Sequence, residues 1–355
     1  IGTAMAGCSG YQVESLEEAV SNPSISDPQG PGLIGPTAIA VREPGIAEDN
    51  EVSDDDVVYV AYGRTGQPDD GSAAASWIEV ASFEDSLFGG WTVDASPRGL
   101  TQVQENSPDD GTNVENVDLA VDSEGDLHVV YTGQLSDWQL IDNVCYIETT
   151  RELAYIFQDD GQWQEPITLE SDTNLTPCSD NGQDFRYEIA HTGGRIAVSS
   201  DDTVHIAYFV TGQSRGIAPE GFFYDIHYQQ FSDSGNATQY TPLTAPDQSG
   251  YININKGIHI AVLNGDSALS IGVVYSVFDN EYDRGVSPAT FAQSQDYGAS
   301  FSSEVVPMPN VPWGPILRAE DGHFFFAFYD VTSSLSRVLV RLGDGAYQER
   351  PLLPA

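Results

Sequence analysis

Asp118, Arg195 and His259 each stand directly before a copy of one short apolar string, LAV in the first case and IAV in the other two. Together these side chains offer a carboxylate, a guanidinium and an imidazole. A guanidinium pairs with a carboxylate or sulfate through two parallel hydrogen bonds, so the set suits a polar, anionic ligand. The same groups also suit a ring of mutually neutralising side chains in a water-filled channel. Either role requires that distant copies of the string lie side by side.

The apolar string belongs to a repeat that runs along most of the chain. Each copy continues through a polar turn into a second apolar string that ends in tyrosine, and two further apolar segments complete it. Four short strands per unit, in units of roughly 55 to 75 residues, predict an all-β protein with the β-propeller fold. We expect five four-stranded blades, with six blades as the alternative. The tyrosines that mark the five copies are Tyr62, Tyr131, Tyr208, Tyr275 and Tyr329.

The repeat also sets the expected domain boundaries. We expect one propeller domain over residues 36–355, after a leader at 1–8 and a linker or extension at 9–35. The extension contains VESLEEAVS (13–21), the one segment that is a candidate helix. The five blades are expected at about residues 36–100, 112–170, 187–244, 252–307 and 312–355.

Repeat equivalence helps to interpret single residues. The first and fifth copies carry Ala38 and Pro315 where the other three carry the ionisable side chains. His128 and His205 both stand three residues before the tyrosine of their copies. A residue type that recurs at one repeat position favours a shared packing role over ligand binding, so we expect these two histidines to be structural.

A turn motif lies in the fourth copy. SQDYGASF (294–301) fits the pattern S-x-D-x-G-x-[ST]-[WF], and shorter relics occur at 158–163, 232–236 and 343–347. The aspartate of such a turn accepts hydrogen bonds from backbone N–H groups, the glycine supplies a positive φ angle, and the aromatic residue packs on the sheet. The motif therefore predicts a stabilised hairpin turn rather than an active site. Together with the four-stranded repeat, it resembles the Asp-box (BNR-repeat) propellers, the superfamily that includes the sialidases.

The resemblance implies a propeller and raises the question of sialidase activity. Sialidases of this superfamily hold the substrate carboxylate with three arginines and use a tyrosine nucleophile, helped by a glutamate, with an aspartate as the acid. Here Arg195 alone is placed at the start of an inner strand, and VREPG (41–45) is a poor match to the N-terminal signature of the family. We therefore expect a non-catalytic binding module. The alternative is a glycoside hydrolase or lyase whose pocket at the channel mouth uses Asp118, Arg195 and His259.

Loop lengths indicate which face of the propeller binds. The turns from first to second and from third to fourth strands are mostly short, whereas connections such as 132–151 and 171–194 are long. Long loops on one face of a rigid scaffold are the usual place for binding. This face would offer arginines to anionic groups and aromatic rings to sugars, unless the rings only pack the loops. The candidate ligand-binding residues are Arg186, Tyr187, Tyr282, Arg284, Trp313 and Trp138.

The net charge limits the range of partners. The chain has 54 Asp and Glu against 13 Lys and Arg, which gives −41 at pH 7. Such a surface repels nucleic acid and anionic lipid head groups, and it suits a salt-adapted organism or a cation-binding extracellular protein. We expect no cofactor, because the acidic insertion at 48–56 is interpreted as a solvated loop; the alternative is that it binds calcium through its carboxylates. The candidate calcium ligands are Asp49, Glu51, Asp54 and Asp56.

The cysteines suggest a location outside the cytoplasm. Ala6-Gly7-Cys8 resembles the end of a bacterial lipobox, in which Cys8 would be lipidated; a fortuitous leader is the alternative. Cys145 and Cys178 remain as a pair, which in an exported protein predicts one disulfide, on the long-loop face. We therefore expect a lipid-anchored propeller at the cell surface or in the periplasm. It would bind a glycan or a surface protein, or else act as a scaffold in a surface assembly.

Overall fold

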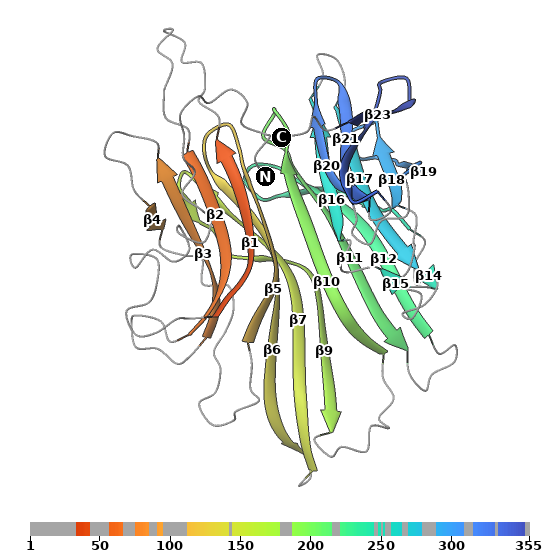
Figure 1. Cartoon of the computed structure of the whole chain (residues 1–355). Coiled ribbons are helices and arrows are strands. Elements are labelled where there is room, and N and C mark those ends of the chain that lie inside the picture. The colour runs from red at the N-terminus through yellow and green to blue at the C-terminus, as the bar shows by residue number, and fades with distance from the viewer. Residues whose placement is uncertain are drawn as a thin grey trace.

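The fold is all-β, and its strands form five separate antiparallel sheets (Figure 1). The structure is a computed structural model. It describes residues 33–42, 57–66, 75–84, 91–94, 112–141, 144–177, 187–214, 221–244, 248–249, 251–252, 257–264, 269–278, 289–308, 315–330 and 333–351. No helix among these residues is long and apolar enough to cross a membrane.

Each sheet is built from strands that are consecutive in the chain, and most neighbours within a sheet are also neighbours in sequence. The first sheet contains β1 (Leu33–Arg42), β2 (Val57–Gly66), β3 (Ala75–Glu84) and β4 (Trp91–Asp94). The second contains β5 (Thr112–Val121), β6 (Leu127–Ile141), β7 (Val144–Asp159), β8 (Gln162–Trp163) and β9 (Ile167–Pro177). The third contains β10 (Tyr187–Val198), β11 (Val204–Ser214), β12 (Gly221–Phe231), β13 (Ala237–Pro242) and β14 (Gln248–Ser249).

The last two sheets follow the same plan. The fourth contains β15 (Tyr251–Ile252), β16 (Ile258–Leu263), β17 (Ser270–Phe278), β18 (Ala289–Ser294) and β19 (Ser302–Val305). The fifth contains β20 (Ile316–Glu320), β21 (His323–Asp330), β22 (Leu335–Arg341) and β23 (Tyr347–Pro351). In all five sheets most antiparallel neighbours follow one another along the chain; the exceptions are β9, which pairs with β7, β14, which pairs with β12, and β15, which pairs with β17.

The five sheets stand in a ring and form a five-bladed β-propeller, as the repeat predicts. The first strands of successive sheets lie next to one another: β1 contacts β5, β5 contacts β10, β10 contacts β16, and β16 contacts β20. This arrangement places the apolar strings of the repeat, which are far apart in sequence, around one axis. The side chains that precede these strings can therefore lie near one another, as a shared site would require.

The core lies between the sheets. Four apolar clusters each combine side chains of two successive sheets, from the first and second to the fourth and fifth. The first of them contains Tyr59 of the first sheet and Tyr131 of the second. Because a sheet inside the ring has a neighbour on each face, its strands are apolar on both sides rather than alternating with polar residues.

The motif turn of the fourth sheet is built as its sequence predicts. Asp296 Oδ1 accepts a hydrogen bond from the backbone N–H of Ser300 at 2.9 Å, and Asp296 Oδ2 accepts one from the Ser300 hydroxyl at 2.6 Å. Gly298 has a φ of 85°. Phe301 packs on the ring of Tyr228 in the third sheet, with 5.1 Å between the ring centroids. Through this contact the turn of the fourth sheet packs against the third sheet.

One predicted loop is instead a long hairpin. Residues 132–151 were expected to connect two strands, but the ladder of β6 and β7 runs from the pair His128–Phe157 to the pair Ile141–Val144. With β9, this hairpin extends beyond the strands of the other sheets (Figure 1). The physical reason is the run CYIETT at 145–150, whose β-branched and aromatic residues favour a continued strand. Trp138 and Cys145 therefore lie in strands.

Candidate functional site

The three ionisable residues occupy one register position in three sheets. In each sheet the partner of this position on the second strand is the residue directly before the repeat tyrosine. The same holds for Ala38 in the first sheet. The four pairs are Ala38–Ala61, Asp118–Val130, Arg195–Ala207 and His259–Val274. The residues that the sequence repeat aligns therefore also have the same place in the strand pairing of their sheets.

The fifth sheet departs from the expected alignment by one residue. Ile316 pairs with Ala327, which precedes the buried Phe328, whereas Tyr329 is exposed. Ile316 therefore takes the position that the sequence pattern assigns to Pro315, and it is 61% exposed. The segment HFFFAFY is apolar at almost every position, so alternation alone did not show which of its residues face the fourth sheet.

Arg195 is oriented by polar groups of two sheets. Its Nη1 donates a hydrogen bond to Asn116 Oδ1 at 2.6 Å and to the carbonyl oxygen of Gly194 at 3.0 Å. Asn116 Nδ2 donates to the same carbonyl oxygen at 2.9 Å. These are the hydrogen bonds that Arg195 makes within the described part of the chain, and its Nε and Nη2 have no hydrogen-bond partner there.

Asn116 was missed by the sequence analysis. It lies two residues before Asp118 on β5, so strand alternation places it on the same face. A β-bulge falls between Val114 and Asn116. Bulges redirect side chains, and an irregularity of this kind is not visible in the sequence.

Asp118 connects the second and third sheets. Its Oδ2 accepts a hydrogen bond from the backbone N–H of Ile196 at 2.9 Å. Burial raises the pKa of the Asp118 carboxyl above its ordinary value, although the positive charge of Arg195 opposes the shift. One carboxylate oxygen of Asp118 already accepts a hydrogen bond from the backbone of β10. We therefore interpret Asp118 as a residue that supports the position of Arg195 rather than one that binds a ligand.

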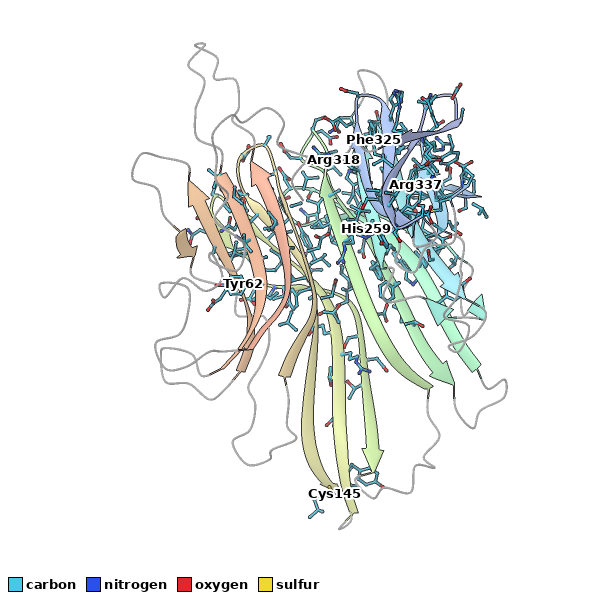
Figure 2. The ribbon with its side chains drawn as sticks, in the orientation of Figure 1. Tyr62, Cys145, His259, Arg318, Phe325 and Arg337 are labelled. Atoms are coloured by element: carbon cyan, nitrogen blue, oxygen red, sulfur yellow. The ribbon has the colours of Figure 1, made fainter. Side chains whose placement is uncertain are left out.

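His259 adds a neutral imidazole to the cluster. It lies on β16, near the middle of the molecule in the view of Figure 2. Burial, together with the smaller effect of the positive charge of Arg195, lowers the pKa of His259 to about 4. At neutral pH the ring is therefore uncharged, with one nitrogen that donates and one that accepts. The cluster combines a guanidinium with a neutral group that suits a hydroxyl.

The two equivalent histidines of the second and third sheets are structural, as their repeat position predicts. His128 Nδ1 lies 2.8 Å from the hydroxyl of Tyr155, and His205 Nδ1 lies 2.7 Å from the hydroxyl of Tyr228. Both imidazoles are completely buried. Each is thus satisfied inside its own sheet and is closed to a ligand.

Most of the predicted long-loop residues lie outside the described part of the chain. Tyr187 begins β10 and Trp138 lies in β6, but their side chains are not among those described. The described residues contain no group of three His, Cys, Asp or Glu that would hold a metal ion. The predictions that fall outside the described residues concern Arg186, Tyr282, Arg284, Trp313, Asp49, Glu51, Asp54, Asp56, Cys8 and Cys178.

Cys145 lies near the tip of the long hairpin and takes part in a disulfide. The β7–β9 ladder ends with Tyr146 opposite Pro177. In the sequence Tyr146 follows Cys145 and Pro177 precedes Cys178. The pairing of Cys145 with Cys178 stays a prediction, and this register is compatible with it.

Comparisons with known proteins assign no family. No family model matches the sequence, and no curated protein sequence matches it. The solved structures with a similar fold include the K499G mutant of NanB sialidase from Streptococcus pneumoniae, at 9% identity and a TM-score of 0.43, over 93% of this chain and 61% of that chain. This chain thus covers less than two thirds of that sialidase.

Two further neighbours are also carbohydrate-active enzymes by name. The GH93 α-L-arabinofuranosidase of Fusarium graminearum has 13% identity and a TM-score of 0.45, over 88% of this chain and 80% of that one. An endo-1,4-β-xylanase from Bacteroides thetaiotaomicron has 10% identity and a TM-score of 0.30, over 82% of this chain and 91% of that one. Likenesses this weak do not transfer an activity, so the site must be judged on its own geometry.

Proposed function

We propose that the protein is an exported binding module that holds an anionic glycan at the axis of the propeller. The observation that carries the proposal is the state of Arg195. Its Nη1 is fixed by Asn116 and Gly194, while Nε and Nη2 have no partner among the described residues. A guanidinium held in one orientation, with two donor nitrogens that have no partner within the described residues, suits the carboxylate or sulfate of a sugar.

The remaining axial positions suit the other parts of a sugar. His259 is neutral at neutral pH, because its pKa is lowered to about 4, and it offers a donor and an acceptor to hydroxyl groups. On the opposite part of the ring, Ala38 and the exposed Ile316 offer apolar surface. A sugar ring has both kinds of face, which favours a glycan over a small inorganic anion.

A binding role is favoured over hydrolysis by the state of the carboxylate. Hydrolysis of a glycosidic bond commonly uses a pair of carboxyl groups in defined geometry. Among the described residues at the axial positions, Asp118 is the one carboxylate, and its Oδ2 is engaged by the backbone of Ile196. We place the protein at the cell surface or in the periplasm, anchored through Cys8, as its leader sequence suggests.

The test is a screen of anionic and neutral glycans with the purified protein. We expect binding to uronic acid or sulfated glycans, a loss of at least about tenfold in Arg195→Ala, and no change in the control Arg350→Ala. Arg350 is an exposed residue of the outer strand β23. Absence of anionic glycan binding, or unchanged binding in Arg195→Ala, would overturn the proposal.

The wild-type protein and the same two variants also distinguish a binding module from an enzyme. Each glycan that binds is incubated with the protein, and the products are analysed by mass spectrometry. Cleavage that disappears in Arg195→Ala but persists in Arg350→Ala would favour a hydrolase or lyase. Intact glycan after prolonged incubation supports the binding module.

A further inference from the structure

Among the described turns that follow the third strand of a sheet, the turn of the third sheet departs from the repeat. In the second, fourth and fifth sheets, an aromatic residue two or three places after the glycine of this turn packs against an apolar cluster. These residues are Trp163, Phe301 and Tyr347. In the third sheet the residues after Gly235 are Asn236, Ala237 and Thr238, and all three are exposed. The positions that pack the other turns are therefore open to solvent here.

The residues at these open positions form an acceptor sequence for N-linked glycosylation. NAT (236–238) fits the pattern N-x-[ST], in which the middle residue is any residue except proline. The chain has one other match, NLT (174–176), because proline rules out NPS (22–24). The two candidate acceptors are thus Asn236 and Asn174.

The turn presents the side-chain amide of Asn236 at the surface. Gly235 has a φ of 74°, and a Cβ there would lie 2.3 Å from the ring of Phe157 in the second sheet. One side of the turn is therefore packed against the second sheet. On the exposed side, Asn236 Nδ2 donates a hydrogen bond to the hydroxyl of Ser234 at 3.0 Å. Because Ser234 is itself exposed, an enzyme can replace this bond without opening the core.

Thr238 is equally accessible. In the ladder of β12 and β13, Phe231 pairs with Ala237 and Gln230 pairs with Gln239, so the register shift leaves Thr238 without a Cα partner. Its hydroxyl donates a long hydrogen bond of 3.3 Å to the carbonyl oxygen of Gln230. The strand β13 is the last strand on the path through its sheet. The amide and the hydroxyl of the acceptor sequence therefore lie together at an outer edge.

The other acceptor sequence has a different setting. NLT (174–176) lies inside β9, where the ladder pairs Asn174 with Thr149 and Thr176 with Ile147 of β7. A segment in such a ladder must give up backbone hydrogen bonds before it can enter the site of an enzyme. The folded protein therefore offers Asn236 rather than Asn174.

We infer that Asn236 is a site of N-linked glycosylation and that Asn174 is not. The donor is an oligosaccharide joined through phosphate to a lipid. The bond from the first carbon of the sugar to the phosphate oxygen breaks, and a bond from that carbon to Asn236 Nδ2 forms. The proton that leaves Nδ2 is taken up by the phosphate. The inference rests on the export that we propose, since this transfer takes place outside the cytoplasm.

The modification is independent of the ligand site. Asn236 lies at the outer edge of the third sheet, whereas Arg195 lies on β10, the strand at the other end of the same path. Loss of the attached glycan is therefore expected to leave binding at Arg195 unchanged. Failure of one proposal does not imply failure of the other.

The inference is tested by the intact mass of the full-length protein, purified from the membrane and culture fractions of the cells that naturally make it. We expect a mass above that of the polypeptide, and removal of the added oligosaccharide by peptide digestion and fragmentation is not needed to see it. Asn236→Gln and Thr238→Val are expected to lose this mass completely. Thr238→Ser keeps the hydroxyl and is expected to keep the mass, as is the matched control Asn174→Gln.

Peptide mass spectrometry identifies the modified residue. Trypsin cleaves after arginine and lysine, so Asn236 falls in the peptide 216–256 and Asn174 in the peptide 152–186. We expect hexose-containing fragments from the first peptide and an unmodified second peptide. An exported protein without added oligosaccharide, or one modified in the peptide 152–186, would overturn the inference alone. Recovery of the protein in the cytoplasm only would overturn the export as well.

Discussion

Asp118 of the second sheet and Ile196 of the third are joined by a hydrogen bond of 2.9 Å between the Asp118 carboxylate and the Ile196 backbone N–H. They are 78 residues apart in the chain. The bond fixes the strand that carries Arg195, so the position of the guanidinium depends on a contact between sheets. The candidate site is therefore a product of the ring rather than of any single blade.

The first prediction concerns this bond. Asp118→Ala leaves the Ile196 N–H without its acceptor, and we expect it to lower the free energy of unfolding by about 1 to 3 kcal/mol. Asp118→Asn keeps an oxygen acceptor without the charge and is expected to stay within about 1 kcal/mol of wild type. Urea denaturation followed by tryptophan fluorescence measures both. An alanine variant as stable as wild type would show that the bond contributes nothing.

A second prediction concerns ionic strength. The chain carries −41 charges, so an anionic ligand approaches against the field of the whole protein. Raising the ionic strength from 0.01 M to 0.15 M shortens the Debye length from about 30 Å to about 8 Å, which screens distant acids more than the direct contact with Arg195. Calorimetry with a uronic acid should therefore show tighter binding at the higher salt concentration. Binding that weakens with salt would indicate that the local ion pair dominates.

The third prediction concerns acid stability. His205 is completely buried between Tyr228 and Ser199, and burial lowers its pKa to about 4 from 6.5. The unfolded chain therefore binds this proton more readily than the folded chain, and stability falls as the pH drops from 6.5 toward 4. A shift of this size corresponds to about 3 kcal/mol.

His205→Gln removes the titrating group. The variant is expected to be less stable at pH 7.5, because the contacts of the imidazole are lost, and to lose less of its remaining stability on acidification. Urea denaturation at several pH values between 4 and 7.5 measures the slope for both proteins. A slope equal to that of wild type would assign the acid sensitivity to other groups.

The fourth prediction compares two glycines with similar backbone angles. Gly298 has a φ of 85°, and a Cβ there would lie 2.3 Å from the ring of Tyr228. Gly322 has a φ of 78°, with nothing within 4 Å of the added atom. Gly322→Ala should cost about 1 kcal/mol from the backbone angle alone, and Gly298→Ala at least about 2 kcal/mol more, because the turn must also move off Tyr228. Equal losses of unfolding free energy in thermal or urea denaturation would mean that the turn can move away from Tyr228 without an energetic cost.

The fifth prediction concerns the cysteines. Peptide mapping under non-reducing conditions should recover one peptide pair that joins Cys145 and Cys178. Cys145→Ser and Cys178→Ser should each make the hairpin of β6 and β7 more sensitive to proteolysis without changing glycan binding at Arg195. A disulfide between Cys8 and either of the other cysteines would contradict both this pairing and the lipid anchor.

The sequence was informative where its signal is local. The apolar strings, the tyrosines that follow them and the turn at 294–301 predict five four-stranded sheets, because alternation and turn chemistry are decided by neighbouring residues. The same repeat predicted that Asp118, Arg195 and His259 share one position. It failed in the fifth copy, where HFFFAFY gives no alternation, and at 132–151, where a hairpin continues through the expected loop.

What the sequence determined by itself is the unit of the fold and the chemical types of the axial side chains, since both are carried within single copies of the repeat. The tertiary structure decided which of these side chains meet. Arg195 is oriented by Asn116 of another sheet, and Ile316 rather than Pro315 completes the axial ring. Contacts between residues so far apart in the chain depend on how whole sheets pack, and no local pattern contains that information.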